Sequence, residues 1–269
     1  MIRKRTPTIV HCLLLLFPAI VVIFSAPAQS FDRKHMVYFP GWAVHSRNHH
    51  VRDLPAGSLT HIIYAFAEID TNDRIAVIDS FAAPDEIDGN ARAIANHGSF
   101  HELRKLKSAH PHLKSVIAVG GWNHSQNFAH VAADPDRSAS FANSVVAFLR
   151  RHDFDGVDID WEFPGGSGKP GNASTADDRT NLTSLMRILR GSLDAAGSVD
   201  GRDYSLSYAT IAGPDKVPHV DWAALGKLCD WVALFGYDYH GSWEKRSNHQ
   251  SPIHHNPASP DDDPRFNIQ

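Results

Sequence analysis

Cysteine is scarce in this chain, since only Cys12 and Cys229 occur among its 269 residues. This scarcity excludes a small extracellular module held together by several disulfides. No run of Lys or Arg follows residue 5 and the formal net charge is −4, so no basic stripe is available for nucleic acid. Only one long apolar stretch exists, at the extreme N-terminus, which excludes a protein with several membrane spans.

Patterns for metals and nucleotides are lacking as well. The 18 histidines include the pairs His49-His50 and His254-His255, but no Cys or carboxylate partners stand at ligand spacing. No G-x-G-x-x-G follows the first expected strand, so the dinucleotide fingerprint is missing. We therefore expect no metal and no other cofactor, and a monomer without stable membrane association.

The N-terminal apolar stretch has the pattern of a secretory signal peptide. Basic residues at 3–5 precede an apolar segment that is densest over 13–24, and residues 26–28 form a small-x-small cleavage pattern. A membrane anchor is the alternative, but Pro18 interrupts the run, which falls short of the roughly 20 residues that a span needs. The sequence predicts a signal peptide at 1–28, cleavage near Ala28 and secretion.

Short apolar runs rich in β-branched and aromatic residues alternate with helical patterns along the rest of the chain. Such runs are typical of strands buried on both faces. The expected strands are 36–42, 61–67, 115–121, 156–162, 204–210 and 231–237. The clearest helices are expected at 100–109, 137–151 and 177–196.

This alternation implies right-handed βαβ units and a parallel sheet. A (β/α)8 barrel and an open doubly wound sheet both fit it. In a barrel the chemistry lies at the C-terminal ends of the strands, and several expected strands end in polar or aromatic residues. The six strands are fewer than the eight of a complete barrel.

The fourth expected strand carries three carboxylates at alternate positions, Asp158, Asp160 and Glu162. Alternate strand residues point to one side, so the three share a face and the apolar residues between them share the other. Burying like charges is costly and raises at least one pKa. The apolar opposite face disfavours a solvated strand, and the rigidity of a strand disfavours a calcium site. The pattern indicates acid–base catalysis, since perturbed carboxylates cluster at functional sites.

With Asp155, these carboxylates form a DxxDxDxE segment that resembles the signature of glycoside hydrolase family 18, the chitinases and their relatives. Four further stretches resemble family elements in the same order: YFPGW at 38–42, YAFA at 64–67, AVGGWN at 118–123 and YDYHGSWE at 237–244. The resemblance implies an α/β fold of the (β/α)8 TIM-barrel type. The fold is expected to be incomplete, with about six βα units, and residues 29–269 are expected to be the catalytic domain, incomplete at its C-terminal end.

The resemblance also implies a secreted chitinase that hydrolyses β-1,4 bonds between N-acetylglucosamine units with retention, the substrate's acetamido group being the nucleophile. Glu162 would be the general acid. Asp160 would hold the acetamido N–H and Asp158 would share a proton with Asp160. The Tyr237 hydroxyl would donate to the acetamido carbonyl, and Asp238 would bind sugar or tune the carboxylates. The expected partner is chitin or chito-oligosaccharides.

A set of substrate-binding residues follows from the same resemblance. Its members are Tyr38, Gly120, Gly121, Trp122, Asn123, Phe163, Phe235, Gly236 and Asp238. Aromatic rings stack on sugar faces, so we expect Trp122 and Trp243 in the cleft, whereas we expect Phe66 in the core. Asp155 does not fall on the same alternation as Asp158, Asp160 and Glu162, and it is expected to be structural.

The sequence departs from the family pattern at some positions, and other functions are alternatives. Ala118 stands where Ser is usual and so loses a hydroxyl that could bond Asp158, and Phe163 stands where Tyr is frequent. A lectin-like chitin-binding protein and an inactive fragment are alternatives to an enzyme, but lectin-like relatives commonly lose the Glu that is present here as Glu162. An endo-β-N-acetylglucosaminidase is a further alternative, although residues 237–244 are more chitinase-like.

Overall fold

The computed structural model describes residues 33–83, 97–257, 263 and 265–268. The expected signal peptide at 1–28 lies outside these residues. Within the described part of the chain, no helix combines the length and apolar character that a membrane span requires.

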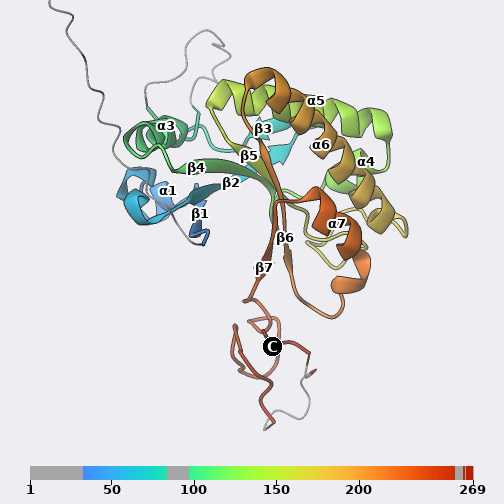
Figure 1. Ribbon diagram of the computed structural model, residues 1–269. Helices are drawn as coiled ribbons and strands as arrows, with labels where there is room; N and C mark the ends of the chain where they lie inside the picture. The colour runs from blue at the N-terminus through green and yellow to red at the C-terminus, as the bar shows by residue number, and fades with distance from the viewer. Residues whose placement is uncertain (1–32, 84–96, 258–262, 264, 269) are drawn as a thin grey trace, which may run out of the picture. The chain divides into compact units, whose positions relative to one another are not determined.

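A sheet with six parallel strands forms the centre of the described chain (Figure 1). The spatial order of the parallel strands is the same as their order in the sequence, so each strand pairs with the next parallel strand along the chain. A barrel is built in this way, whereas an open doubly wound sheet reverses its order at a switch point. In spatial order the strands are β1 (Met36–Pro40), β2 (His61–Ile69), β4 (Lys114–Gly120), β5 (Gly156–Asp160), β6 (Ser205–Ile211) and β7 (Trp231–Phe235).

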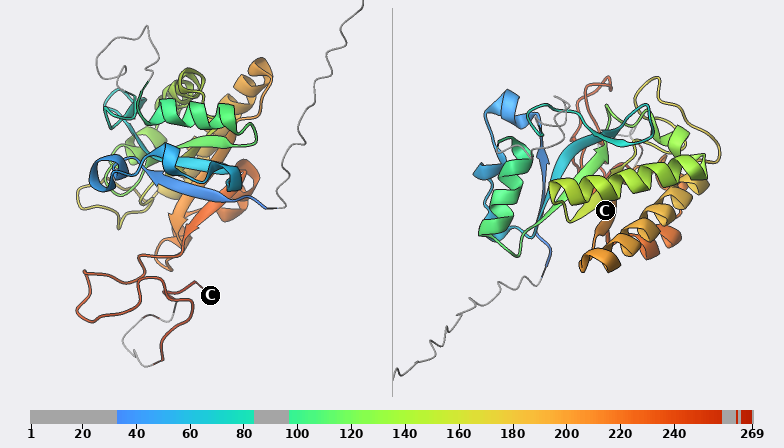
Figure 2. Two further views of the ribbon diagram at one scale, coloured as in Figure 1. Left: turned by 90° about the vertical axis from the view of Figure 1, so that its left-hand side faces the viewer. Right: turned by 90° about the horizontal axis from the view of Figure 1, so that it is seen from above.

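Helices form the connections between these strands. The two longest, α5 (Pro135–His152) and α6 (Asp178–Asp200), lie side by side along the sheet (Figure 2). An Asp134 cap and a proline at the first turn begin α5, and Asp153 in the left-handed region ends it. The other helices of the described residues are α1 (Ala43–Arg47), α3 (Ser99–Ala109), α4 (Phe128–Ala132) and α7 (Trp222–Leu228), with 3-10 turns η1 (Val51–Asp53), η2 (Ala56–Ser58) and η3 (Val217–His219).

The sequence-based elements are confirmed. All six expected strands form, each bounded within two residues of its expected limits, and the three expected helices are present. The barrel-type α/β fold is therefore correct, and it is incomplete because the described residues supply six parallel strands. The short antiparallel strand β3 (Ile75–Val77), which pairs with the end of β2, was not expected, because three residues are too few for a recognisable period.

Alternation along the strands separates two apolar layers. Val157 and Ile159 of β5 belong to the large core that packs under the helices. The opposite face of the sheet holds a much smaller cluster, which includes Val116 and Ala118 of β4. On that face Asp158 lies in register with Ala118 on one side and Ser207 on the other. On this face of the sheet, opposite the large core, polar groups thus replace part of the apolar packing.

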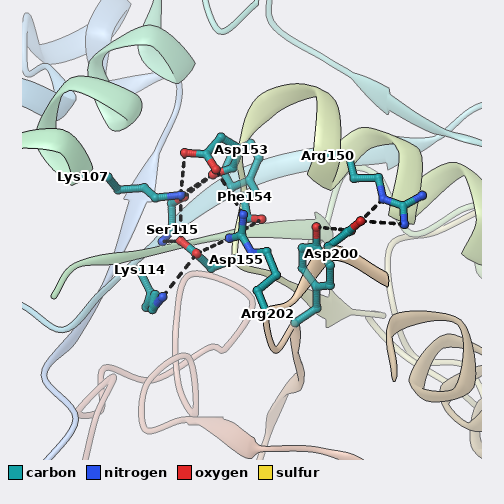
Figure 3. A network of polar contacts seen from close by, with 10 residues as sticks. Lys107, Lys114, Ser115, Arg150, Asp153, Phe154, Asp155, Asp200 and Arg202 are labelled. Carbon is teal, nitrogen blue, oxygen red and sulfur yellow. Dashed lines mark hydrogen bonds and ion pairs between the residues drawn. The ribbon is translucent and has the colours of Figure 1, made fainter. Parts of the chain in front are cut away.

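Asp155 lies just before β5, at the opposite end of that strand from Glu162, and is buried (Figure 3). Its carboxylate lies 2.9 Å from Lys107 Nζ and also pairs with Arg202. The backbone N–H of Ser115, in β4, donates to it at 2.9 Å. These contacts join α3, β4 and the chain before β6, so Asp155 has the surroundings of a structural residue.

We expect Asp155→Ala to lower the free energy of unfolding by about 3–5 kcal/mol, because it leaves the cations around it without a buried partner. Lys114→Ala is the matched control, since Lys114 Nζ lies 3.6 Å from the same carboxylate but its side chain is 53% exposed; its loss is expected below about 1 kcal/mol. Urea unfolding measures both. Equal losses in the two variants would contradict a structural role for Asp155.

Candidate active site

Asp158 and Asp160 lie on β5, and Glu162 lies two residues beyond its end. The strand was expected to reach Glu162, but it stops earlier because other groups take over its hydrogen bonds. The Asp160 carbonyl accepts from the backbone N–H of Gly121 at 2.8 Å, and the Ser125 hydroxyl accepts from the Glu162 N–H at 3.0 Å. Glu162 and Asp160 nevertheless both face one cleft.

Two hydroxyl groups hold Asp158, which is fully buried. Tyr38 Oη donates to one carboxylate oxygen at 2.8 Å and Ser207 Oγ donates to the other at 2.5 Å. Burial raises the pKa of Asp158 to about 6, although both hydrogen bonds oppose this change. Ser207 was not predicted, because its role depends on the register of β6 against β5; it supplies a hydroxyl that Ala118 lacks.

Asp160 and Glu162 share a poorly solvated site and interact electrostatically. Burial raises the pKa of Asp160 well above its ordinary value, with the charges of Glu162 and Asp158 adding to the effect. Asp160 Oδ1 has no hydrogen-bond partner among the described residues. Burial, followed by the charge of Asp238, raises the pKa of Glu162 to about 7. The pair therefore retains a proton near neutral pH.

Tyr237 and Asp238 approach this pair from the chain that follows β7. Burial raises the pKa of Tyr237 to about 12, and nearby carboxylates, Asp160 foremost, add to it, so its hydroxyl remains a hydrogen-bond donor. The ring of Tyr237 stacks on Phe235 at a centroid distance of 5.3 Å. Asp238 has a positive φ of 57° and accepts a hydrogen bond from Gln250 Nε2 at 2.7 Å.

Two glycines end β4 beside the carboxylates. Gly120 has a φ of +115°, and a Cβ there would lie 2.1 Å from the carbonyl oxygen of Asp160. Gly121 has a φ of +78°, and its Cβ would lie 2.8 Å from the Phe66 ring. Only glycine fits both positions. They let the chain pass close to Asp160 and turn Trp122 toward the cleft, which Trp122 lines.

The cleft has a volume of about 1430 Å³ and a largely aromatic wall. Trp122 and Trp243 line it as expected, with 46% and 64% of their surfaces exposed. Trp42, also exposed, was not singled out as a cleft residue; its place within the 38–42 stretch was the available signal. Phe66 was expected in the core, but it is only half-buried, stacks with Trp42 and faces the cleft.

Most of the predicted site residues meet at this cleft. The structure also places Asn123 there, where its Oδ1 accepts a hydrogen bond from Lys169 Nζ at 3.0 Å. Asp158, Gly120, Gly121 and Gly236 are not among the residues that line the cleft. Those that line it are Tyr38, Trp122, Asn123, Asp160, Glu162, Phe163, Phe235, Tyr237 and Asp238.

No group of three or more His, Cys, Asp or Glu within the described ranges is placed to hold a metal ion. The chemistry that this arrangement offers is proton transfer by a carboxyl pair next to a tyrosine hydroxyl. Such a pair, set in a cleft at the C-terminal end of a barrel strand, suits general acid–base catalysis.

Comparison with known proteins shows which family the chain resembles. Chitinase A1 of Niallia circulans is 34% identical over an alignment that covers 95% of this chain and 42% of that protein. The structure of chitinase ChiA74 from Bacillus thuringiensis is 33% identical with a TM-score of 0.81, over 87% of this chain and 44% of that one. A mutant catalytic domain of an Ostrinia furnacalis Group II chitinase, solved with the oligosaccharide (NAG)5, is 26% identical with a TM-score of 0.74, over 87% of this chain and 58% of that one.

The chain thus spans less than half the length of Chitinase A1 and of ChiA74. Over its own length the likeness is nearly continuous, because the family model for glycosyl hydrolases family 18 matches residues 34–269. That range contains the sheet, the cleft and the three carboxylates of the β5 region. The chain belongs to glycosyl hydrolase family 18.

Proposed function

We propose that this chain is a chitinase that cleaves β-1,4 bonds between N-acetylglucosamine units, with retention of configuration at the anomeric carbon. The observation that carries the proposal is the poorly solvated carboxyl pair of buried Asp160 and half-buried Glu162 beside Tyr237 in the cleft. Support for the substrate comes from the chitinases that the chain resembles, one of which was solved with a chito-oligosaccharide.

Glu162 is the general acid in this mechanism. With its pKa raised to about 7, about half of the Glu162 carboxyl is protonated at neutral pH, and this form delivers its proton to the glycosidic oxygen as the bond from the anomeric carbon breaks. The acetamido carbonyl oxygen of the same sugar attacks the anomeric carbon and forms an oxazolinium ring. The Glu162 carboxylate then removes a proton from water, which opens the ring and restores the acetamide.

Asp160 and Tyr237 hold the acetamido group during the attack. The carboxyl of Asp160 accepts the acetamido N–H, which aligns the carbonyl oxygen, and its negative charge stabilises the oxazolinium cation. The Tyr237 hydroxyl donates to the carbonyl oxygen. Asp158 lies next to Asp160 on the strand and exchanges a proton with it, while Tyr38 and Ser207 fix the orientation of Asp158. The exposed cleft tryptophans stack on sugar faces.

The principal test is Glu162→Gln, which keeps the shape of the side chain but removes the transferable proton. Turnover of a chito-oligosaccharide should fall by about 10²–10⁴-fold, as loss of a general acid does, while binding measured by calorimetry stays close to that of the wild type. Near-wild-type turnover in the variant would refute the role of Glu162. A wild-type chain that binds but does not cleave would favour the lectin-like function, and one that cleaves only N-glycans would favour the endo-β-N-acetylglucosaminidase.

A second test asks whether burial of the Asp160 carboxylate lowers the stability of the folded chain. Because the native pKa of Asp160 is raised, the folded chain binds more protons than the unfolded chain above about pH 4, so its stability falls as the pH rises. Asp160→Asn removes this loss. Its Tm should exceed that of the wild type at pH 8, and the gap should narrow toward pH 4. Asp177→Asn, the same charge change at an exposed position, should show no such gap. A Tm gap for Asp160→Asn that does not depend on pH would contradict the account.

We also propose that the protein is secreted after cleavage near Ala28. The basic start, apolar segment and small-x-small pattern of residues 1–28 support this. Expression of the whole chain in a secreting host should release a protein whose N-terminal residue, read by mass spectrometry, is Gln29. Retention of the uncleaved chain in the cell would contradict the proposal.

A further inference from the structure

A further buried carboxyl group, which the mechanism above does not use, contacts the loop that follows Glu162. Asp178, the first residue of α6, is fully buried. One of its oxygens accepts from the backbone N–H groups of Gly165 at 2.9 Å and Thr175 at 3.0 Å, and the other accepts from Thr175 Oγ1 at 2.7 Å. The N-terminus of a helix favours a carboxylate at this position. We refer to residues 163–175 as the acid loop.

The acid loop begins at the residue after Glu162 and turns sharply. Gly165, Gly166 and Ser167 have successive φ values of +77°, +97° and +65°. Backbone of this kind is open to glycine but unfavourable for serine, so it has to be held in place by other contacts. The bond from the Gly165 N–H to Asp178 is a direct tether at the start of this turn.

The acid loop also packs tightly against Glu162 itself. A Cβ on Gly168 would lie 2.1 Å from the Glu162 carbonyl oxygen, so these two stretches of backbone are in direct contact. On its other side the loop packs against η3, because a Cβ on Gly165 would lie 2.2 Å from His219 Nδ1. Phe163, at the start of the loop, lines the cleft and lies 5.0 Å from Lys216 Nζ. These contacts hold the first part of the loop, as far as Gly168, against Glu162 and η3.

We propose that Asp178 is a positioning residue for Glu162: by tethering Gly165 and Thr175 it holds the acid loop against the Glu162 backbone and keeps the Glu162 carboxyl in its half-buried, catalytic position. This inference rests on the proposed function only for the role of Glu162 as general acid. The tether itself acts on the geometry of Glu162 whether or not the chain turns over chitin.

The test compares the effect of Asp178→Asn on the pKa of Glu162 with the effect of Asp177→Asn. The first replaces the charged acceptor by a neutral amide, so the two backbone N–H groups lose charge-assisted hydrogen bonds and the Thr175 hydroxyl has to turn from donor to acceptor. The second removes the same charge one residue away, from an exposed side chain that makes no capping bond. The Glu162 carboxyl is titrated by 13C NMR, with its signal assigned from Glu162→Gln. We expect Asp178→Asn to lower the pKa of Glu162 from about 7 toward the ordinary value of glutamate, because a loosened loop admits water. Asp177→Asn should leave it unchanged.

A kinetic readout separates positioning of the acid from a general loss of structure. Asp178→Asn should lower kcat on a chito-oligosaccharide by about 10²-fold, which is the scale for a misplaced catalytic group. An aryl glycoside with a good leaving group needs little protonation, so its kcat should fall far less. Similar losses on both substrates would overturn the inference.

The titration is decisive even without turnover. An unchanged pKa of Glu162 in Asp178→Asn would overturn the inference, whatever the activity. A lowered pKa in a chain whose wild type does not cleave chito-oligosaccharides would refute the proposed function and uphold the tether. Should Asp178→Asn fail to fold, Thr175→Val removes one of the three hydrogen bonds without a charge change. It is then expected to shift the pKa in the same direction, and no shift would overturn the inference.

Discussion

Desolvation of the carboxyl groups at the end of β5 is the constraint on which the rest of the site depends. Asp158 and Asp160 have almost no solvent contact, and Glu162 lies two residues beyond Asp160, in the cleft. Water would stabilise their charges far better than this environment does, which is why the pKa of each is raised. The fold tolerates that cost because the outward residues of the same strand, Val157 and Ile159, are anchored in the large core. Because these pKa values are raised, the carboxyl groups hold a proton near neutral pH.

The two ends of β5 treat the same kind of residue in opposite ways. Before the strand, Asp155 is surrounded by cations and a backbone donor, so its burial stabilises the sheet. At its last residue, Asp160 keeps an oxygen without a partner among the described residues. In barrels the C-terminal ends of the strands carry chemistry and the N-terminal ends carry stability. The contrast between a satisfied and an unsatisfied carboxylate follows that division within a single strand.

The sequence predicted what depends on local pattern. The six strands and the shared face of Asp158 and Asp160 follow from short apolar runs and alternation. Contacts set by three-dimensional register could not be read in this way. Ser207 reaches Asp158 only because β6 pairs with β5 in that register, and Tyr38 comes from a strand 120 residues away. The end of β5 at Asp160 likewise depends on Ser125, from another loop. The cis peptide bond between Glu162 and Phe163 has no local signal, since such bonds are very rare without proline.

The central claim is that a protonated Glu162 and the substrate's own acetamido group cleave the glycosidic bond between them. Its most direct test is the configuration of the newly formed reducing end, followed by 1H NMR during the first minutes of chito-oligosaccharide hydrolysis, before mutarotation. The account predicts the β-anomer, because the oxazolinium ring shields one face and water attacks from the other. Initial release of the α-anomer would show direct attack by water and would contradict the assignment of roles to Glu162 and Asp160.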